Sequence, residues 1–207
     1  MSDLRPRIKF CGFTRPEDVT AALALGVEAI GLNFARGPRR VTPAQGAVLA
    51  ACIPPFASAT ALFLDADEAT ILAVMAETRC TAVQLHGHES PELAASLARR
   101  FPVIKAFAVR TATDLDAIRG YPADAYLLDA AVPGQAGGTG VAWDHHLLVG
   151  RDLGRPVVLA GGLNSATVAA AVAAVRPWAV DAASGIESAP GLKDVARMEA
   201  FVRALRG

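Results

Sequence analysis

The sequence predicts an α/β fold: a TIM-type (β/α)8 barrel with eight parallel strands, formed by residues 1–207 as one catalytic domain. Short apolar runs alternate with longer alanine-rich amphipathic runs from end to end, at about 25 residues per unit. The short runs are continuously apolar, as expected of strands that are buried on both faces. Glycine-rich turns come late, after the seventh and eighth short runs, where such a barrel binds phosphate.

The elements follow in a regular order. We expect strands at residues 8–11, 29–34, 58–64, 82–85, 103–109, 125–128, 156–159 and 178–180. We expect helices at residues 16–25, 43–52, 68–78, 91–100, 113–119, 143–149, 165–175 and 193–205. Thr14 and Thr42 stand where they can cap the first two helices, and Pro16 and Pro43 suit a first helical turn.

An open, doubly wound sheet is the main alternative, because it also alternates strands and helices. Against it, no G-x-G-x-x-G pattern follows the first strand. No linker, charge block or low-complexity tract divides the chain, which favours a single domain.

Composition narrows the classes of function. Hydrophobic residues make up 53% of the chain and charged residues 19%, which is typical of a globular protein with a large core. Twenty basic residues balance twenty acidic ones, so we expect no nucleic-acid partner and no anionic membrane surface. No run approaches the ~18 apolar residues of a membrane span. Three irregularly spaced cysteines predict neither a disulfide framework nor a zinc cluster, and indicate a reducing cytoplasm.

Two side chains at strand ends are candidates for acid–base chemistry, because a barrel of this kind has its active site at those ends. Cys11 ends the first strand, and Asp129 ends the sixth. Each also has a simple structural interpretation, Cys11 as a small buried hydrophobe and Asp129 as a loop anchor. Groups that face each other across a barrel mouth can act on one substrate as base and acid.

The late glycine turns are candidates for phosphate binding. Gly161 and Gly162 follow the seventh strand, and Ser184 and Gly185 follow the eighth. Glycines let the main chain approach a phosphate closely, and exposed N–H groups bind it. Asp181 lies beside these turns, and because a carboxylate is a poor phosphate ligand we assign it an orienting role. Two ordinary tight turns are the alternative.

Three further segments could reach the mouth. Arg39 and Arg40 follow the second strand and can pair with a substrate carboxylate, although a solvated basic loop is the commoner fate of such a run. Residues 137–140 (GGTG), with Gly138, resemble a loop that folds over a substrate. His86 ends the fourth strand, and we favour a structural role for it, because no other histidine completes a metal-ligand pattern with it.

Seven segments, in order, resemble the phosphoribosylanthranilate isomerase family of tryptophan biosynthesis. They are residues 9–14 (KFCGFT), 38–43 (PRRVTP), 83–87 (VQLHG), 127–129 (LLD) with 137–140 (GGTG), 159–164 (LAGGLN), 180–187 (VDAASGIE) and 190–194 (PGLKD). The ordered set is far more specific than any one segment.

The resemblance implies an Amadori rearrangement of N-(5′-phosphoribosyl)anthranilate to the 1-deoxyribulose 5-phosphate product. It implies that Cys11 is the general base, Asp129 the general acid and Arg39 the carboxylate ligand, with the glycine turns holding the phosphate. It also implies no metal, no organic cofactor, a small phosphorylated substrate, and a monomer or homodimer.

Departures from the family pattern leave the acid and base untouched. Residues 182–183 (AA) replace a usual V-S pair, and the segment before Arg39 differs, so that Arg40 can share the carboxylate role. Two alternatives stay open at this point. One is another sugar-phosphate barrel enzyme, such as an epimerase or an indole-glycerol-phosphate-synthase-like enzyme, and the other is a non-catalytic phosphate-binding barrel.

Overall fold

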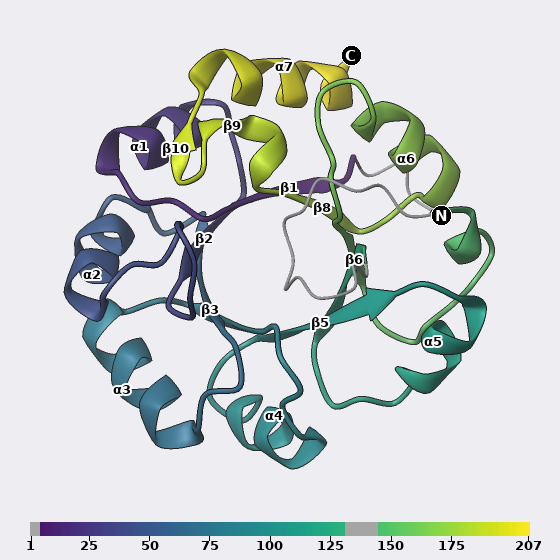
Figure 1. Ribbon diagram of the computed structural model, residues 1–207, viewed down its shortest axis with the longest axis horizontal. Coiled ribbons are helices and arrows are strands. Elements are labelled where there is room, and N and C mark those ends of the chain that lie inside the picture. Colours follow the sequence, from purple (N-terminus) through teal and green to yellow (C-terminus); the bar gives the residue numbers. More distant parts are fainter. Residues whose placement is uncertain (1–4, 131–144) are drawn as a thin grey trace.

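The computed structural model describes residues 5–130 and 145–207, and it contains the predicted barrel. Eight parallel strands close on themselves in chain order, so that β1 pairs with both β2 and β8. Figure 1 shows this ring of strands inside an outer ring of helices. The barrel prediction is confirmed, and the open doubly wound sheet was the wrong alternative.

Most elements lie within a few residues of their predicted positions. The strands are β1 (Arg7–Cys11), β2 (Ala29–Asn33), β3 (Ser58–Phe63), β4 (Ala82–Leu85), β5 (Val103–Val109), β6 (Ala125–Ala130), β7 (Val157–Leu159) and β8 (Ala179–Ala182). The helices are α1 (Pro16–Ala24), α2 (Pro43–Ala51), α3 (Glu68–Thr78), α4 (Pro91–Leu97), α5 (Ala112–Ala117), α6 (Val168–Val175) and α7 (Val195–Arg206).

Two short 3-10 helices and a hairpin complete the described elements. They are η1 (His145–Leu148), η2 (Ser184–Ile186), and the antiparallel pair β9 (Glu187–Ala189) and β10 (Leu192–Lys193). The helix predicted at residues 143–149 is thus a single 3-10 turn in its described part. The hairpin was not predicted. It takes up Lys193, the first residue of the predicted last helix, and α7 instead begins after Asp194, whose side chain caps it.

One of the two predicted helix caps is confirmed. Thr42 caps α2 and forms a reciprocal capping box with Gln45. Thr14 does not cap α1, whose N-cap is Arg15. The Thr14 hydroxyl instead donates a 2.6 Å hydrogen bond to the carbonyl of Gly191, so it joins the end of β1 to the hairpin.

The barrel has an apolar layer outside and a small-residue layer inside. The main core lies between strands and helices; there Phe10 of β1 meets Phe201 of α7 edge to face, 5.4 Å between ring centroids. The inner cluster is made of Ile104 and the small or apolar side chains Ala106, Ala125, Leu127, Val158, Ala160 and Ala179. This cluster fills part of the barrel interior, and the pocket described below lies at the C-terminal ends of the strands.

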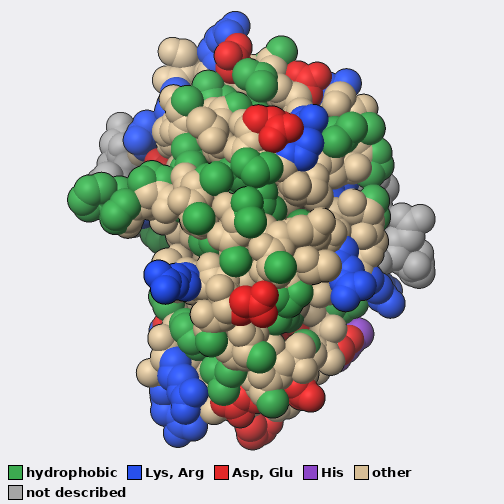
Figure 2. Space-filling view, turned by 90° about the vertical axis from the view of Figure 1, so that its left-hand side faces the viewer, with side chains coloured by type: hydrophobic (Ala, Val, Ile, Leu, Met, Phe, Trp, Pro, Cys, Tyr) green, Lys and Arg blue, Asp and Glu red, His purple; other side chains and the backbone are tan. Residues whose placement is uncertain are grey.

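The outer surface has no dominant charge on the face shown in Figure 2, where acidic and basic side chains are scattered among apolar ones. This agrees with a formal net charge of zero. Within the two described ranges, none of the helices combines the length and apolar character that spanning a bilayer requires.

Candidate active site

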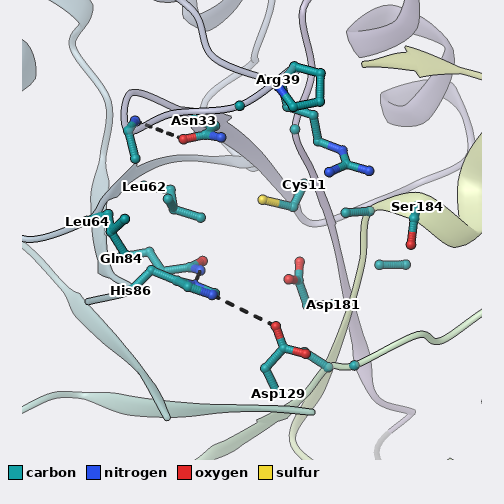
Figure 3. Close-up of a pocket in the computed structure, with 18 of the residues that line it drawn as sticks. Cys11, Asn33, Arg39, Leu62, Leu64, Gln84, His86, Asp129, Asp181 and Ser184 are labelled. Carbon is teal, nitrogen blue, oxygen red and sulfur yellow. Dashed lines mark hydrogen bonds and ion pairs between the residues drawn. The ribbon is translucent and has the colours of Figure 1, made fainter. Parts of the chain in front are cut away.

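A pocket of about 560 Å³ opens at the C-terminal ends of the barrel strands (Figure 3). It brings together seven of the residues that the sequence predicted for the site: Cys11, Arg39, Asp129, Gly161, Gly162, Asp181 and Ser184. Gly185 follows directly behind Ser184. Gly138 lies outside the described residues. The predicted site residues, spread over most of the chain, therefore meet in one place.

The Cys11 thiol is a buried group at the wall of this pocket, with only 7% of the residue exposed. It sits against Gly31, its partner in the β1–β2 register. A Cβ atom at Gly31 would lie only 2.6 Å from Cys11 Sγ and 3.0 Å from Cys11 Cα. A glycine at this position therefore leaves the space that the thiol occupies.

Replacing Gly31 by alanine is expected to displace the thiol. We expect Gly31→Ala to slow the alkylation of Cys11 by iodoacetamide several-fold, because the new methyl group competes for the space of Sγ. Gly46→Ala is the matched control. Gly46 lies in α2, and a Cβ atom there would contact the Phe34 ring and not the Cys11 thiol. Both variants lose stability in a thermal melt, and only Gly31→Ala changes Cys11 reactivity. Equal alkylation rates in both would contradict this interpretation.

A buried ion pair lies beside the thiol. Lys9 and Asp181 are partners in the β1–β8 register, and Lys9 Nζ lies 2.8 Å from Asp181 Oδ1. Burial would lower the pKa of Lys9, but the Asp181 carboxylate and the thiol together raise it above its ordinary value, so Lys9 is a cation. The Lys9 cation also lies close enough to the Cys11 side chain to act on it electrostatically.

The charges around Cys11 act in opposite directions. Burial raises the pKa of the thiol, and so does the Asp181 carboxylate. The cations Lys9 and Lys193 lower it, without fully offsetting burial. Arg39 also interacts electrostatically with the thiol. The fraction of reactive thiolate is therefore set by burial and Asp181, which lower it, against Lys9 and Lys193, which raise it.

The two members of the ion pair are expected to shift the thiol pKa in opposite directions. Lys9→Met removes a stabilising cation, so the pKa of Cys11 rises further. Asp181→Asn removes a destabilising anion, so the pKa falls. The pH dependence of iodoacetamide alkylation, read for each cysteine by peptide mass spectrometry, measures both. Cys52 and Cys80 serve as internal controls, and shifts of the same sign in the two variants would contradict the electrostatic account.

Asp129 enters the pocket from β6, next to His86 (Figure 3). The distance from His86 Nε2 to Asp129 Oδ2 is 3.9 Å. On its other side, His86 Nδ1 lies 2.9 Å from the side-chain amide of Gln84, which fixes the ring orientation. Burial, followed by the nearby Lys9, lowers the pKa of His86 to about 4, so the imidazole is neutral at pH 7. His86 thus lines the pocket as an uncharged, oriented ring.

Two arginines of the β2–α2 loop, Arg36 and Arg39, line the pocket. Arg40 is exposed and does not line it. The aliphatic stem of Arg39 lies on Gly12, where any Cβ would collide with it. Its guanidinium group is already engaged in a bidentate pair: Nε and Nη2 donate to the two carboxylate oxygens of Glu187 at 2.9 and 2.7 Å.

The two glycine turns lie together at the pocket rim. Gly161 and Gly162 have φ angles of 92° and 71°, a region that strongly favours glycine. Gly185 packs so closely on the carbonyl of Leu163 that any side chain there would collide with it. The turn after β7 and the short helix η2 after β8 are therefore packed against each other, with little room for side chains between them.

Sequence reasoning did not single out several polar residues that the structure places in or under the site. They are Lys9, Asn33, Gln84, Glu187 and Lys193. One signal was available: only three of the twenty basic residues are lysines, and each of them is buried in an ion pair. Gln84 and Asn33 gave no comparable signal in the sequence.

Comparison with known proteins agrees with this geometry. The family model described as N-(5'phosphoribosyl)anthranilate (PRA) isomerase matches residues 8–204. An N-(5'-phosphoribosyl)anthranilate isomerase of Geobacter sulfurreducens is 42% identical over 202 residues, 97% of this chain and 98% of that protein.

Two solved structures are similar over nearly the whole chain. The phosphoribosyl anthranilate isomerase of Thermotoga maritima has a TM-score of 0.90 at 34% identity, covering 98% of this chain and 99% of that one. A phosphoribosyl anthranilate isomerase in complex with reduced 1-(o-carboxyphenylamino)-1-deoxyribulose 5-phosphate has a TM-score of 0.87 at 33% identity, with the same coverage. The chain belongs to the phosphoribosylanthranilate isomerase family.

Proposed function

We propose that this chain converts N-(5′-phosphoribosyl)anthranilate into 1-(2-carboxyphenylamino)-1-deoxyribulose 5-phosphate, the aldose–ketose isomerisation of tryptophan biosynthesis. One observation carries the proposal: Cys11 from β1 and Asp129 from β6 line the same pocket at the barrel mouth. The reaction needs one group that gives a proton and another that takes one, acting on neighbouring atoms of the substrate.

In the proposed mechanism Asp129 acts first, as the general acid. Its proton goes to the ribose ring oxygen, the bond from that oxygen to C1′ breaks, and the nitrogen lone pair forms a protonated Schiff base with C1′. The Cys11 thiolate then takes the C2′ proton, the electron pair of the C–H bond becomes the C1′–C2′ double bond, and the π electron pair of the C1′=N bond returns to the nitrogen. The resulting enolamine tautomerises to the C2′ ketone: the 2′-hydroxyl loses its proton as the C2′=O bond forms, and a proton is added at C1′. Cys11 gives up the proton it gained and Asp129 regains the one it lost by exchange with solvent, so the enzyme returns to its starting state.

Charge complementarity supports the orientation of the substrate. Arg39 and Arg36 lie on the β2–α2 side of the pocket and suit the anthranilate carboxylate. Gly161, Gly162 and Ser184 line the β7–β8 side of the pocket, with Gly185 directly after Ser184, and these turns suit the phosphate group through main-chain N–H groups. The ribose then lies between the two ends, in the part of the pocket where Cys11 and Asp129 stand. We assign Asp181 an electrostatic effect on Cys11 and an ion pair with Lys9, and not the role of a phosphate ligand.

The proposed chemistry needs no cofactor, since it moves only protons. A cysteine that acts as a base must stay reduced, which suits the cytoplasm. The three cysteines are free thiols in the structure. The oligomeric state, monomer or homodimer, stays a prediction that light scattering on the purified protein decides.

Complementation tests the proposed function in a cell. A bacterial strain that lacks its own isomerase and carries this chain is expected to grow without tryptophan, whereas the same strain carrying Cys11→Ala is not. Growth with neither, while the wild-type protein is folded and soluble, would contradict the proposal. Metal-dependent turnover of another sugar phosphate, lost with a chelator, would then favour an epimerase, and tight ligand binding without turnover would favour a binding barrel.

A further inference from the structure

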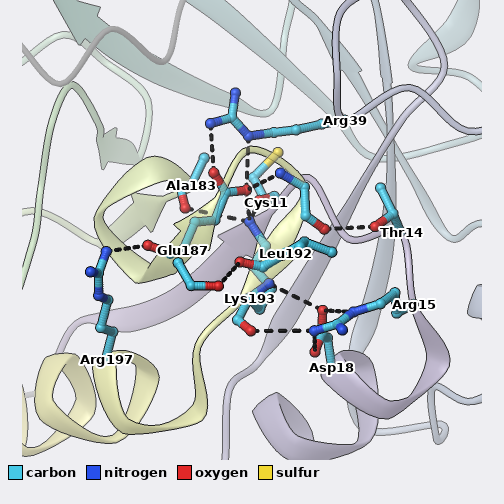
Figure 4. A network of polar contacts seen from close by, with 12 residues as sticks. Cys11, Thr14, Arg15, Asp18, Arg39, Ala183, Glu187, Leu192, Lys193 and Arg197 are labelled. Atoms are coloured by element: carbon cyan, nitrogen blue, oxygen red, sulfur yellow. Dashed lines mark hydrogen bonds and ion pairs between the residues drawn. The ribbon is translucent and has the colours of Figure 1, made fainter.

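A buried network of three charged side chains lies under the pocket rim (Figure 4). Glu187 is its centre, with 4% of its side chain exposed. Besides the two bonds from Arg39, it accepts a 2.7 Å hydrogen bond from Lys193 Nζ and a 3.2 Å bond from the main-chain N–H of Gly191. Burial alone would raise the pKa of Glu187, but Arg39 and Lys193 outweigh it and lower the pKa, so Glu187 is ionised.

Lys193 connects this network to the main chain around the thiol. Its side chain is fully buried, and Nζ donates to the carbonyl oxygens of Cys11 and Ala183 at 2.6 and 3.4 Å. Cys11 ends β1, and Ala183 immediately precedes Ser184 and Gly185 at the glycine turn after β8. Glu187 is therefore linked, through one lysine, to the strand that carries the thiol and to the turn assigned to the phosphate.

The geometry of the Arg39 pair leaves one edge of the guanidinium group for a ligand. Glu187 takes the edge formed by Nε and Nη2. Figure 4 shows the third nitrogen, Nη1, pointing away from Glu187. With its stem held on Gly12 and its inner edge held by Glu187, the guanidinium group is fixed in one plane. An oriented fork of this kind binds a carboxylate better than a mobile arginine, since less freedom is lost on binding.

The charges of the network also point to an anionic ligand. While Cys11 is in its thiol form, which its raised pKa favours, Arg39 and Lys193 are two cations and Glu187 is one anion, so the network has an excess of one positive charge next to the pocket. The neighbouring pair Lys9–Asp181 is neutral by itself. A buried excess charge is costly unless an opposite charge meets it. The site is therefore best satisfied when an anion approaches the exposed edge of Arg39.

We propose that Glu187 is a positioning residue of this enzyme, which holds Arg39 in the orientation that receives the substrate carboxylate. The inference rests on the proposed function, because it names the partner of that carboxylate. Glu187 does not touch the substrate and acts through Arg39. Its role differs from that of a simple anchor of the β9–β10 hairpin, because an anchor would affect every substrate alike.

Two substrates separate these roles. One is N-(5′-phosphoribosyl)anthranilate, and the other is the analogue made from ribose 5-phosphate and aniline, which lacks the carboxylate. We expect Glu187→Gln to raise KM for the carboxylated substrate about tenfold or more, with a smaller change in kcat. The reason is that the Glu187 carboxylate no longer holds the guanidinium group of Arg39 in its orientation. For the aniline analogue we expect KM to change less than twofold. In the double variant with Arg39→Met, Glu187→Gln is expected to add nothing.

Two further variants keep the test decisive. Arg197→Ala removes a donor to the main-chain carbonyl of Glu187 and leaves the carboxylate in place, so KM for both substrates is expected to stay as in the wild type. Glu187→Asp keeps the charge with a shorter reach, and it replaces Glu187→Gln if that variant does not fold. We expect it also to raise KM for the carboxylated substrate alone.

The outcomes distinguish this inference from the proposed function. If the wild-type chain does not turn over the carboxylated substrate, the proposed function fails. If the wild type is active but Glu187→Gln changes KM equally for the two substrates, or for neither, Glu187 is only a structural anchor and the inference is overturned.

Discussion

Cys11→Ala is expected to lower kcat for N-(5′-phosphoribosyl)anthranilate by about a hundredfold or more, because general base catalysis contributes about that much and alanine has no group that takes a proton. We expect KM to change little, since Cys11 makes no charged contact with the substrate in the proposed mechanism. Stopped-flow or steady-state fluorescence of the anthranilate group measures both constants.

Cys52→Ala is the matched control for this variant. Cys52 is the C-terminal cap of α2 and does not line the pocket, so the same chemical change at that position is expected to leave kcat unaltered. A thermal melt of each variant separates loss of chemistry from loss of fold. Wild-type-like turnover by a folded Cys11→Ala protein would show that another group takes the C2′ proton.

Asp129→Asn is expected to lower kcat by a similar factor, about a hundredfold or more. Asparagine has nearly the same shape as aspartate, but it has no carboxyl proton to give to the ring oxygen. Next to Asp129, the neutral imidazole of His86 is not expected to replace it, because burial keeps the pKa of His86 near 4 and little of it is protonated at pH 7. Comparing kcat of the wild-type protein with kcat of Asp129→Asn at pH 7 measures the effect.

Asp116→Asn is the control for the second variant. Asp116 is an exposed residue of α5 whose carboxylate pairs with Arg151 at 3.0 Å, so its loss is expected to leave kcat within about twofold of the wild type. If Asp129→Asn kept full activity, ring opening would need no acid from the protein, and the role assigned to Asp129 would be wrong.

The repeat of strand and helix was readable from the sequence because the strands of a barrel are buried on both faces, and burial requires continuous apolar runs. The hairpin of β9 and β10 was not readable in the same way. Its strands are three and two residues long, too short for a periodic pattern, and what holds it is long-range: Lys193 bonds to Cys11, 182 positions away in the sequence. Tertiary contacts decided where α7 begins.

The site was partly readable for a related reason. Cys11, Asp129 and the glycine turns stand at strand ends, and barrel topology alone gathers strand ends into one mouth. The supporting charges were hidden because their roles depend on which strands are neighbours. Lys9 matters because β1 closes the barrel against β8 and brings it to Asp181. All three lysines of the chain are buried and paired, each with a carboxylate that is distant or on another element in the sequence.

The central claim is that this chain is an isomerase that uses Cys11 as its base. The most direct test generates the substrate from anthranilate and phosphoribosyl pyrophosphate with a transferase, without metal in the final step, and follows anthranilate-type emission after this protein is added. We expect a fast fall in emission with the wild-type chain and none with Cys11→Ala. An unchanged emission with well-folded wild-type protein, or an equal fall with both proteins, would contradict the account.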